Sequence, residues 1–198
     1  MWPEIKRKLF HFTSFIYVLG LVYCPRHIFI IIILLVLLSE IMIEYLRLKN
    51  TFFRTLFLKY FGSLIREHER EHFTGVFWML LGVLLVSVIL PPPSLAVCAL
   101  LYLILGDAIA SLVGKRLQGP AWPRSPKKIV GSAACFLLCF FIGYILLRPE
   151  YGWSGVIWGA IIATWVEKGI IKLDDNFTIP FFGALTLALC YHIKPFFL

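Results

Sequence analysis

A series of long apolar windows, separated by short polar segments, constrains the fold of this chain more than any other feature. Crossing a bilayer as a helix takes roughly 17–25 mainly apolar residues. Hydrophobic residues make up 60% of the chain, and its mean hydropathy is +0.87. The windows span residues 9–24, 28–46, 73–90, 94–113, 129–148, 153–170 and 178–194. We therefore expect an all-α, polytopic integral membrane protein, a single domain over residues 1–198 with about seven transmembrane helices.

Lysine and arginine are concentrated in alternate polar segments. They occur at the N-terminus (Lys6, Arg7 and Lys8), in segment 47–72, in the basic loop 114–128 and after the sixth window (Lys168 and Lys172). Cytoplasmic loops of membrane proteins are enriched in these residues. This pattern predicts an N-in, C-out topology, with these segments on the cytoplasmic face of a bacterial cytoplasmic membrane. The first window lacks a small-residue cleavage site, so we expect it to remain in the mature protein.

The formal net charge of +8 is thereby placed on one face of the membrane. Such a face attracts anionic lipid headgroups and soluble polyanions, and we expect no nucleic-acid partner.

Segment 47–72 has apolar residues at 48, 52, 56 and 60, with basic residues between them. This spacing predicts an amphipathic helix at the membrane interface, although an ordinary connecting helix would also fit. The cysteines show neither a disulfide framework nor metal-binding spacing.

Ionisable side chains gather at the cytoplasmic ends of the predicted spans, where burial in lipid is costly without a partner or cavity. The acids in or beside the spans are Glu40, Glu44, Asp107 and Glu167. The adjoining loops add His68 and Glu69 before the third span, and Asp174, Asp175 and Asn176 before the seventh. Carboxylates and basic loops therefore share one face, which indicates a site there for a phosphorylated ligand.

Carboxylates beside lysines suit a magnesium-bound polyphosphate, because Mg²⁺ binds through one or two carboxylates together with substrate phosphates. We expect phosphoryl transfer, in which positioning and charge neutralisation supply most of the catalysis. The predicted metal ligands are Asp107, Asp174 and Asp175, and the predicted catalytic residues are Asp107, His68, Glu69 and Glu167. The predicted nucleotide-binding or phosphate-binding residues are Gly106, Gly114, Lys115, Lys127, Lys128, Gly131, Ser132 and Asn176. No P-loop motif is present.

Structural interpretations compete with parts of this site. The small residues from Gly106 to Gly114 could form a helix-packing face without any ligand. The run Asp174-Asp175-Asn176 could cap the last helix, although a cap uses only one of the three side chains. Asp107 favours a site, because an unpaired carboxylate at that depth is unfavourable.

Four motifs, in this order, resemble the CTP-dependent lipid-alcohol kinases, which include dolichol kinase, phytol kinase and the yeast-type diacylglycerol kinase. They are Glu4-x-x-Arg7-Lys8-x-x-His11; Arg66-Glu67-His68-Glu69 with Thr74-Gly75; Gly106-Asp107-Ala108 with Gly114-Lys115; and Asp174-Asp175-Asn176 before Pro180. The loop Ser125-Pro126-Lys127-Lys128 is also similar to CDP-diacylglycerol synthases, which use the same nucleotide. The resemblance implies CTP as donor and a membrane lipid alcohol, such as a polyprenol or phytol, as acceptor.

The chain departs from both families at one position, because no glutamate precedes Gly131 where they usually have one. Either Glu167 or Glu69 takes that role, or the donor triphosphate binds in a different position; the sequence does not distinguish these alternatives. The remaining alternatives are a cytidylyltransferase acting on a phosphorylated lipid and an ion-coupled lipid transporter. The sequence leaves open the identity of the lipid, the general base and the oligomeric state.

Overall fold

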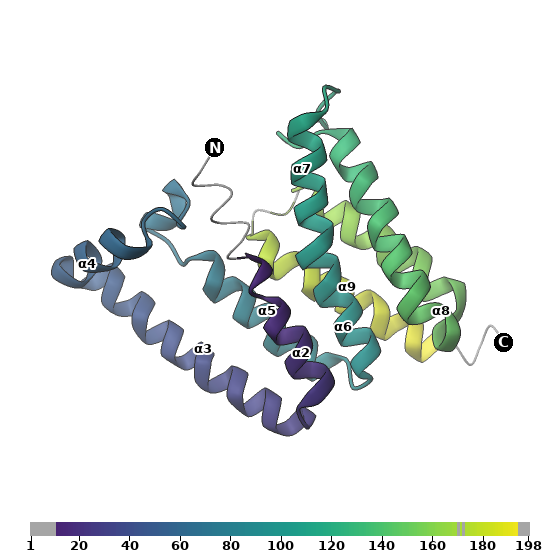
Figure 1. Cartoon of the computed structure of the whole chain (residues 1–198), viewed down its shortest axis with the longest axis horizontal. Coiled ribbons are helices and arrows are strands. Elements are labelled where there is room, and N and C mark those ends of the chain that lie inside the picture. The colour runs from purple at the N-terminus through teal and green to yellow at the C-terminus, as the bar shows by residue number, and fades with distance from the viewer. Residues whose placement is uncertain (1–10, 170, 172, 194–198) are drawn as a thin grey trace.

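The structure, a computed structural model, describes residues 11–169, 171 and 173–193, without the side chains of 149–151 and 193. The elements in chain order are α2 (Phe15–Tyr23), α3 (Arg26–Lys49), α4 (Thr51–Phe61), the 3₁₀-helix η1 (Glu67–Arg70), α5 (Gly75–Ile89), α6 (Pro93–Leu101), the π-helix η2 (Tyr102–Asp107), α7 (Ala108–Arg116), α8 (Ile129–Glu167) and α9 (Asp175–Ile193). The β pairing in the described part is one isolated bridge, between Ala121 and Lys128. The expected all-α class is confirmed (Figure 1).

Among the described residues, three helices are long and apolar enough to cross a membrane: Arg26–Lys49, the continuous Pro93–Arg116 and Ile129–Arg148. The outer face of α3 exposes large apolar side chains, including Ile31 and Leu35, which a lipid environment accommodates. These helices indicate an integral membrane protein. Around the first and third windows the described helices are shorter, with nine residues in α2 and 15 in α5. The count of seven spans and the N-in, C-out orientation remain predictions.

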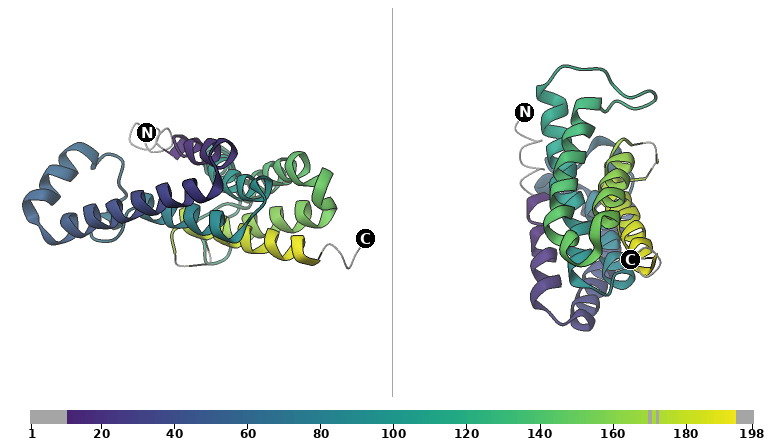
Figure 2. Two further views of the ribbon diagram at one scale, coloured as in Figure 1. Left: turned by 90° about the horizontal axis from the view of Figure 1, so that it is seen from below. Right: turned by 90° about the vertical axis from the view of Figure 1, so that its right-hand side faces the viewer.

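Helix α8 covers two of the predicted windows and reverses direction between them. Gly152, at φ 67°, interrupts the helical backbone in a left-handed conformation that glycine adopts without steric cost. The two arms then pack closely, because a Cβ atom built on Gly143 would lie 3.3 Å from the Cα of Val156. Figure 2 shows the arms running side by side. The predicted boundary between the windows 129–148 and 153–170 therefore corresponds to a real turn.

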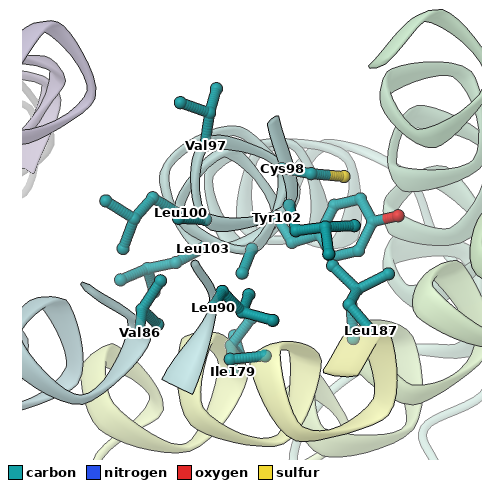
Figure 3. Packing of buried hydrophobic residues seen from close by; sticks show 14 of the residues in the cluster. Val86, Leu90, Val97, Cys98, Leu100, Tyr102, Leu103, Ile179 and Leu187 are labelled. Carbon is teal, nitrogen blue, oxygen red and sulfur yellow. The ribbon is translucent and has the colours of Figure 1, made fainter. Parts of the chain in front are cut away.

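The continuous helix formed by α6, η2 and α7 lies at the centre of the bundle. Its side chains pack against α5, α8 and α9, with Cys98, Tyr102 and Leu103 almost fully buried (Figure 3). The π-helical segment ends at Asp107. Short π-helical segments inside α-helices often occur at functional sites. The apolar core thus gives way to a polar cluster at Asp107.

Helix α4 lies apart from the rest of the bundle and packs on the end of α3 (Figure 1). It begins at a capped N-terminus, because the side chain of Asn50 accepts a hydrogen bond from the backbone N–H of Phe53 at 3.0 Å. None of its residues is buried. A helix at this position agrees with the predicted amphipathic segment, whose location at the membrane interface remains a prediction.

Candidate functional site

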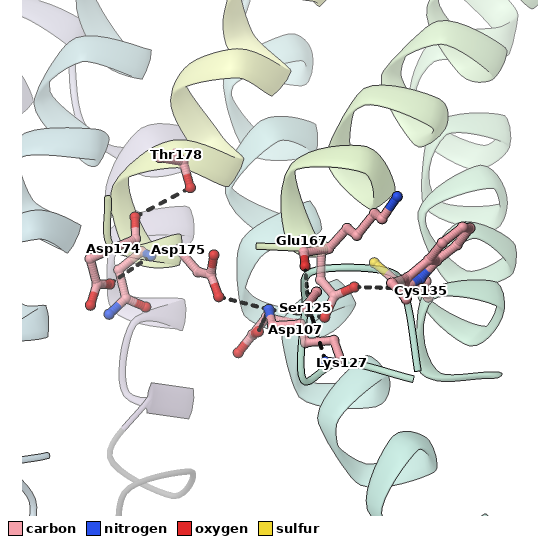
Figure 4. A network of polar contacts seen from close by, with 12 residues as sticks. Asp107, Ser125, Lys127, Cys135, Glu167, Asp174, Asp175 and Thr178 are labelled. Atoms are coloured by element: carbon pink, nitrogen blue, oxygen red, sulfur yellow. Dashed lines mark hydrogen bonds and ion pairs between the residues drawn. The ribbon is translucent and has the colours of Figure 1, made fainter. Parts of the chain in front are cut away.

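Lys127 lies at the centre of a cluster of three carboxylates that come from different elements (Figure 4). Its Nζ atom is 2.7 Å from Oδ2 of Asp175 on α9, 3.1 Å from Oε1 of Glu167 on α8, and 3.9 Å from Oδ1 of Asp107. One ammonium group therefore faces three carboxylates. If all are ionised, the cluster has excess negative charge, which favours the binding of a further cation.

The pKa values of both Asp175 and Lys127, which form the shortest ion pair of the cluster, are raised above their ordinary values. Burial raises the pKa of the Asp175 carboxyl to about 6; Lys127 opposes this shift, and Asp107 adds to it. Burial alone would lower the pKa of the Lys127 ammonium, but Asp175, Asp107 and Glu167 together raise it above its ordinary value. Lys127 therefore stays charged, whereas Asp175 titrates close to neutral pH.

Hydrogen bonds from the basic loop hold the cluster in place. Ser132 donates to Oε2 of Glu167 at 3.1 Å and accepts from the indole N–H of Trp122 at 3.0 Å. Ser125 donates to the backbone carbonyl of Lys168 at 2.6 Å. The ammonium group of Lys168 also lies 4.0 Å from the centre of the Trp122 ring. These contacts fasten the loop that carries Lys127 to the end of α8.

The three polar residues at the start of α9 have separate partners. Asp174 caps the helix by accepting from the backbone N–H of Asn176 at 2.9 Å, and its other oxygen accepts from Arg66 at 3.0 Å. Asp175 pairs with Lys127. The amide of Asn176 donates to the carbonyl of Gly75 at 3.3 Å. One residue of the run is thus a cap, as the structural interpretation required, and the other two face a cavity.

That cavity has a volume of about 940 Å³ and is lined by charged side chains in one part and by apolar side chains in another. One end contains Asp107, Lys127, Glu167 and Asp175. Apolar side chains contribute much of the remaining wall, and they include Ile43, Phe53, Phe57, Phe61, Leu64 and Ile65. The cavity therefore suits a molecule with a charged or strongly polar end and an apolar body.

Most of the predicted site residues line this cavity. Besides those already named, they are Glu69, Gly114, Lys115, Lys128, Gly131 and Asn176. Four do not line it: Gly106, His68, Ser132 and Asp174. Among these, Ser132 holds Glu167 instead, and His68 is exposed. The structure therefore brings together Asp107 and Asp175 of the predicted metal ligands and turns Asp174 toward Arg66.

The glycines occupy close helix contacts, as the packing interpretation proposed. A Cβ atom on Gly131 would lie 2.5 Å from the carbonyl oxygen of Ala110, and one on Gly106 would lie 2.9 Å from the sulfur of Cys139. Gly114 and Gly131 face each other where α7 and α8 approach. A role of these glycines in phosphate binding stays a prediction. Arg7 and Lys8 of the N-terminal motif lie outside the described residues.

Comparisons with known proteins find distant relatives of the chain, three of which are named as lipid kinases. An uncharacterized protein of Rickettsia prowazekii is 28% identical over 98% of this chain and 96% of its own length. CTP-dependent diacylglycerol kinase 1 of Schizosaccharomyces pombe is 28% identical over 94% of this chain and 93% of its own length. The chain is a distant homologue of the CTP-dependent diacylglycerol kinases. This finding confirms the family resemblance and supports a CTP-dependent lipid kinase in general terms.

The coverage differs among these kinases. The kinase of the same name from Eremothecium gossypii is 29% identical over 92% of this chain, but the match spans only 65% of that protein's length. No protein-family model matches the chain, and no solved structure matches it significantly.

The carboxylates around Lys127 fit a magnesium ion, since Asp107, Glu167 and Asp175 offer the hard oxygen atoms that Mg²⁺ prefers. A second group of potential ligands in the described part is His68, Glu69 and Asp174, whose ligand atoms lie within 4.8 Å of one another. Arg66 already faces both acids of that group, at 3.9 Å from Glu69 and 3.0 Å from Asp174. Lys127 faces all three acids of its own cluster in the same way, and among the described residues Asp107, Glu167 and Asp175 do not form a second group this compact. The choice of metal ligands therefore stays a prediction.

The sequence did not predict a buried arginine, Arg47, that binds the backbone of the segment before α5. Arg47 was assigned only to a cytoplasmic loop, but its side chain is completely buried and pairs with Glu44. It also donates to the carbonyls of Glu69 (3.1 Å), Arg70 (3.0 Å) and His72 (2.6 Å), which fixes the segment before α5. The spacing of Glu44 and Arg47, one helical turn apart at the end of a span, was the available signal.

Proposed function

We propose that the protein transfers the γ-phosphoryl group of CTP to the hydroxyl of a membrane lipid alcohol. The observation that carries this proposal is that the Lys127 cluster and a wall of aromatic and aliphatic side chains line the same cavity. A soluble substrate would not need the apolar wall, and a purely apolar ligand would not need the charged end. The distant homology to CTP-dependent lipid kinases supports CTP as the donor.

In this proposal the charged end binds the nucleotide. Asp107, Glu167 and Asp175 would hold Mg²⁺, which would neutralise phosphate charge. Lys115, Lys127 and Lys128 line the same cavity and would bind phosphate oxygens directly. The lipid oxygen attacks the γ-phosphorus while a carboxylate that lines the cavity accepts the hydroxyl proton, and the bond between that phosphorus and the bridging oxygen breaks, so that CDP leaves. Positioning of donor and acceptor would supply much of the rate enhancement. The site would lie on the cytoplasmic side of the membrane.

The identity of the acceptor lipid is a separate part of the proposal. The relatives are named as diacylglycerol kinases, which supports diacylglycerol as the first acceptor to test. The isoprenoid alcohol expected from the sequence stays a prediction, and nothing in the comparisons favours it.

Labelled nucleotide tests the proposal directly. Purified protein in detergent is incubated with Mg²⁺, γ-labelled CTP and, in separate reactions, 1,2-dioctanoylglycerol, phytol and a polyprenol. We expect label in the organic phase together with release of CDP, and the productive lipid identifies the acceptor class. Labelled pyrophosphate in a reaction with phosphatidic acid would establish a cytidylyltransferase instead. No nucleotide consumption with any lipid would reject the kinase and leave the transporter alternative.

A further inference from the structure

The wall of the cavity formed by α4 consists of three phenylalanines at helical spacing. Phe53, Phe57 and Phe61 recur every four residues and therefore lie on one face of the helix. The rings of Phe57 and Phe61 are 5.1 Å apart between their centres. No residue of α4 is buried. This aromatic face thus borders open space rather than the protein core, and that space has room for an apolar chain.

A neighbouring face of α4, about 100° around the helix axis from the first, is apolar as well. Phe52, Leu56 and Tyr60 are exposed, and the side chain of Phe52 is 79% accessible. Arg54 and Lys59 lie between them in the sequence and can extend toward lipid phosphates. A helix with one apolar face outward and another against a cavity is suited to the membrane interface. The cavity then borders the bilayer, so the occupant of its apolar part is a membrane lipid.

Helix α3 also contributes an acid to the lining of the cavity. Glu40 projects from α3, and its Oε1 is 3.3 Å from the hydroxyl of Thr74. That hydroxyl lies closer to Oε1 of Glu44, at 2.6 Å, and it has only one hydrogen to donate. The hydrogen therefore goes to Glu44, and the carboxylate of Glu40 keeps acceptor capacity toward the cavity. A lipid hydroxyl is a donor of the required kind.

We propose that the α3–α4 side of the cavity is the acceptor-lipid subsite, in which Glu40 accepts a hydrogen bond from the lipid hydroxyl and Phe53, Phe57 and Phe61 pack on the chain. This inference rests on the proposed kinase function, because it assigns the apolar part of the same cavity to the lipid substrate. It makes Glu40 a positioning residue. The nucleotide remains at the Lys127 end.

Two neighbouring phenylalanines provide a matched test. Phe53→Ala removes an aromatic ring from the cavity wall, whereas Phe52→Ala removes one from the outer face of the same helix. We expect Phe53→Ala to raise the KM for the lipid roughly 5-fold to 20-fold and to leave the KM for CTP unchanged, since burial of an aromatic ring contributes on the order of 1–2 kcal/mol. Phe52→Ala should leave both values close to those of the wild-type protein.

Glu40→Gln tests the polar part of the subsite. An amide accepts a weaker hydrogen bond than a carboxylate does, so we expect the KM for the lipid to rise roughly 3-fold to 10-fold and the KM for CTP to remain unchanged. Equilibrium binding of labelled 1,2-dioctanoylglycerol and labelled phytol without nucleotide gives a readout that does not depend on catalysis. The lipid that binds should bind more weakly to both Phe53→Ala and Glu40→Gln.

The outcomes separate the subsite from the kinase function. If the wild-type protein is active and both variants keep wild-type lipid KM and lipid binding, the subsite proposal is overturned. If the KM for CTP rises instead, this side of the cavity serves the nucleotide, and the proposal is again overturned. If the wild-type protein has no kinase activity but binds lipid in a manner that depends on Phe53 and Glu40, the subsite stands and the kinase function is wrong.

Discussion

At the scale of single residues, the three carboxylates around Lys127 carry more negative charge than one ammonium group balances. Partly buried charges are costly unless each is well paired, so this arrangement is not a device for stability. Its charge instead matches a ligand that brings positive charge with it, as a magnesium nucleotide does.

Replacing Asp107 with asparagine removes a negative oxygen and adds no bulk. We expect Asp107→Asn to reduce the rate of CTP-dependent lipid phosphorylation by at least about 100-fold, because it weakens charge stabilisation in the site. The variant should still insert into membranes and purify as a folded protein, since the Asp107 side chain is partly exposed. Labelled phosphate transfer and thermal unfolding in detergent measure the two properties. Wild-type activity in this variant would remove Asp107 from the mechanism.

Asp175 should make the folded protein less stable at neutral pH in the absence of divalent cations. Its pKa is raised by burial to about 6, so the folded state binds this proton more tightly than the unfolded chain does. The resulting stability is present at low pH and is lost as the pH rises through about 6. We expect Asp175→Asn to raise the free energy of unfolding at pH 7.5 by on the order of 1–3 kcal/mol. This gain should shrink by half or more at pH 4.5.

Thermal unfolding in detergent with a chelator measures this difference between Asp175→Asn and the wild-type protein. Glu71→Gln is the control, because Glu71 is an exposed acid that pairs with Arg54 at 3.7 Å. That change should have little effect at either pH. Lower stability of Asp175→Asn at pH 7.5 would show instead that the ion pair with Lys127 outweighs the cost of burial.

At the scale of elements, one arginine connects α3, α4 and the segment before α5. Arg47 pairs with Glu44, donates to three backbone carbonyls of residues 69–72, and lies 5.6 Å from the centre of the Phe57 ring. Glu44 in turn accepts from the backbone N–H of Thr74 at 3.0 Å. A buried ion pair therefore helps to hold the segment that carries Glu69 and Gly75 to the cavity.

Breaking this pair should be costly, because it leaves Glu44 buried without its counter-ion. We expect Arg47→Met to lower the free energy of unfolding by about 3–5 kcal/mol. Arg54→Met is the matched control: Arg54 is partly exposed and lies on α4, close to the same segment, and its replacement should cost less than about 1 kcal/mol. Thermal unfolding in detergent compares the two variants. Equal losses would show that Arg47 has no special role in stability.

The sequence predicted elements better than contacts between them. Apolar windows located α3, the central helix and both arms of α8, and the spacing of apolar residues located α4, because these depend on local composition and period. Four of the predicted site residues, Asp107, Lys127, Glu167 and Asp175, lie together in the structure, and their role in a site remains a prediction. The separation of Asp174 from Asp175 was not predicted, because it depends on how α9 is rotated against Arg66. The π-helical turn before Asp107 has no sequence signal.

At the scale of the whole molecule, the orientation in the membrane decides which compartment supplies the nucleotide. The helix Pro93–Arg116 is continuous over 24 residues. Such a helix is about 36 Å long and exceeds the hydrocarbon core of about 30 Å. If this helix crosses the bilayer as predicted, the loop before Pro93 and the basic loop after Arg116 lie on opposite faces of the membrane. CTP is a cytoplasmic metabolite in this proposal, so the basic loop should be cytoplasmic.

Cysteine labelling in cells tests this orientation. After replacement of the five native cysteines, Pro91→Cys and Pro123→Cys each introduce one thiol at an exposed loop position and leave every lysine and arginine in place. We expect a membrane-impermeant maleimide to label Pro91→Cys in intact cells, and Pro123→Cys only after permeabilisation, because positive loops are retained on the cytoplasmic side. The reverse pattern would place the Lys127 cluster outside the cytoplasm, where it would have no access to CTP, and would overturn both the topology and the proposed donor.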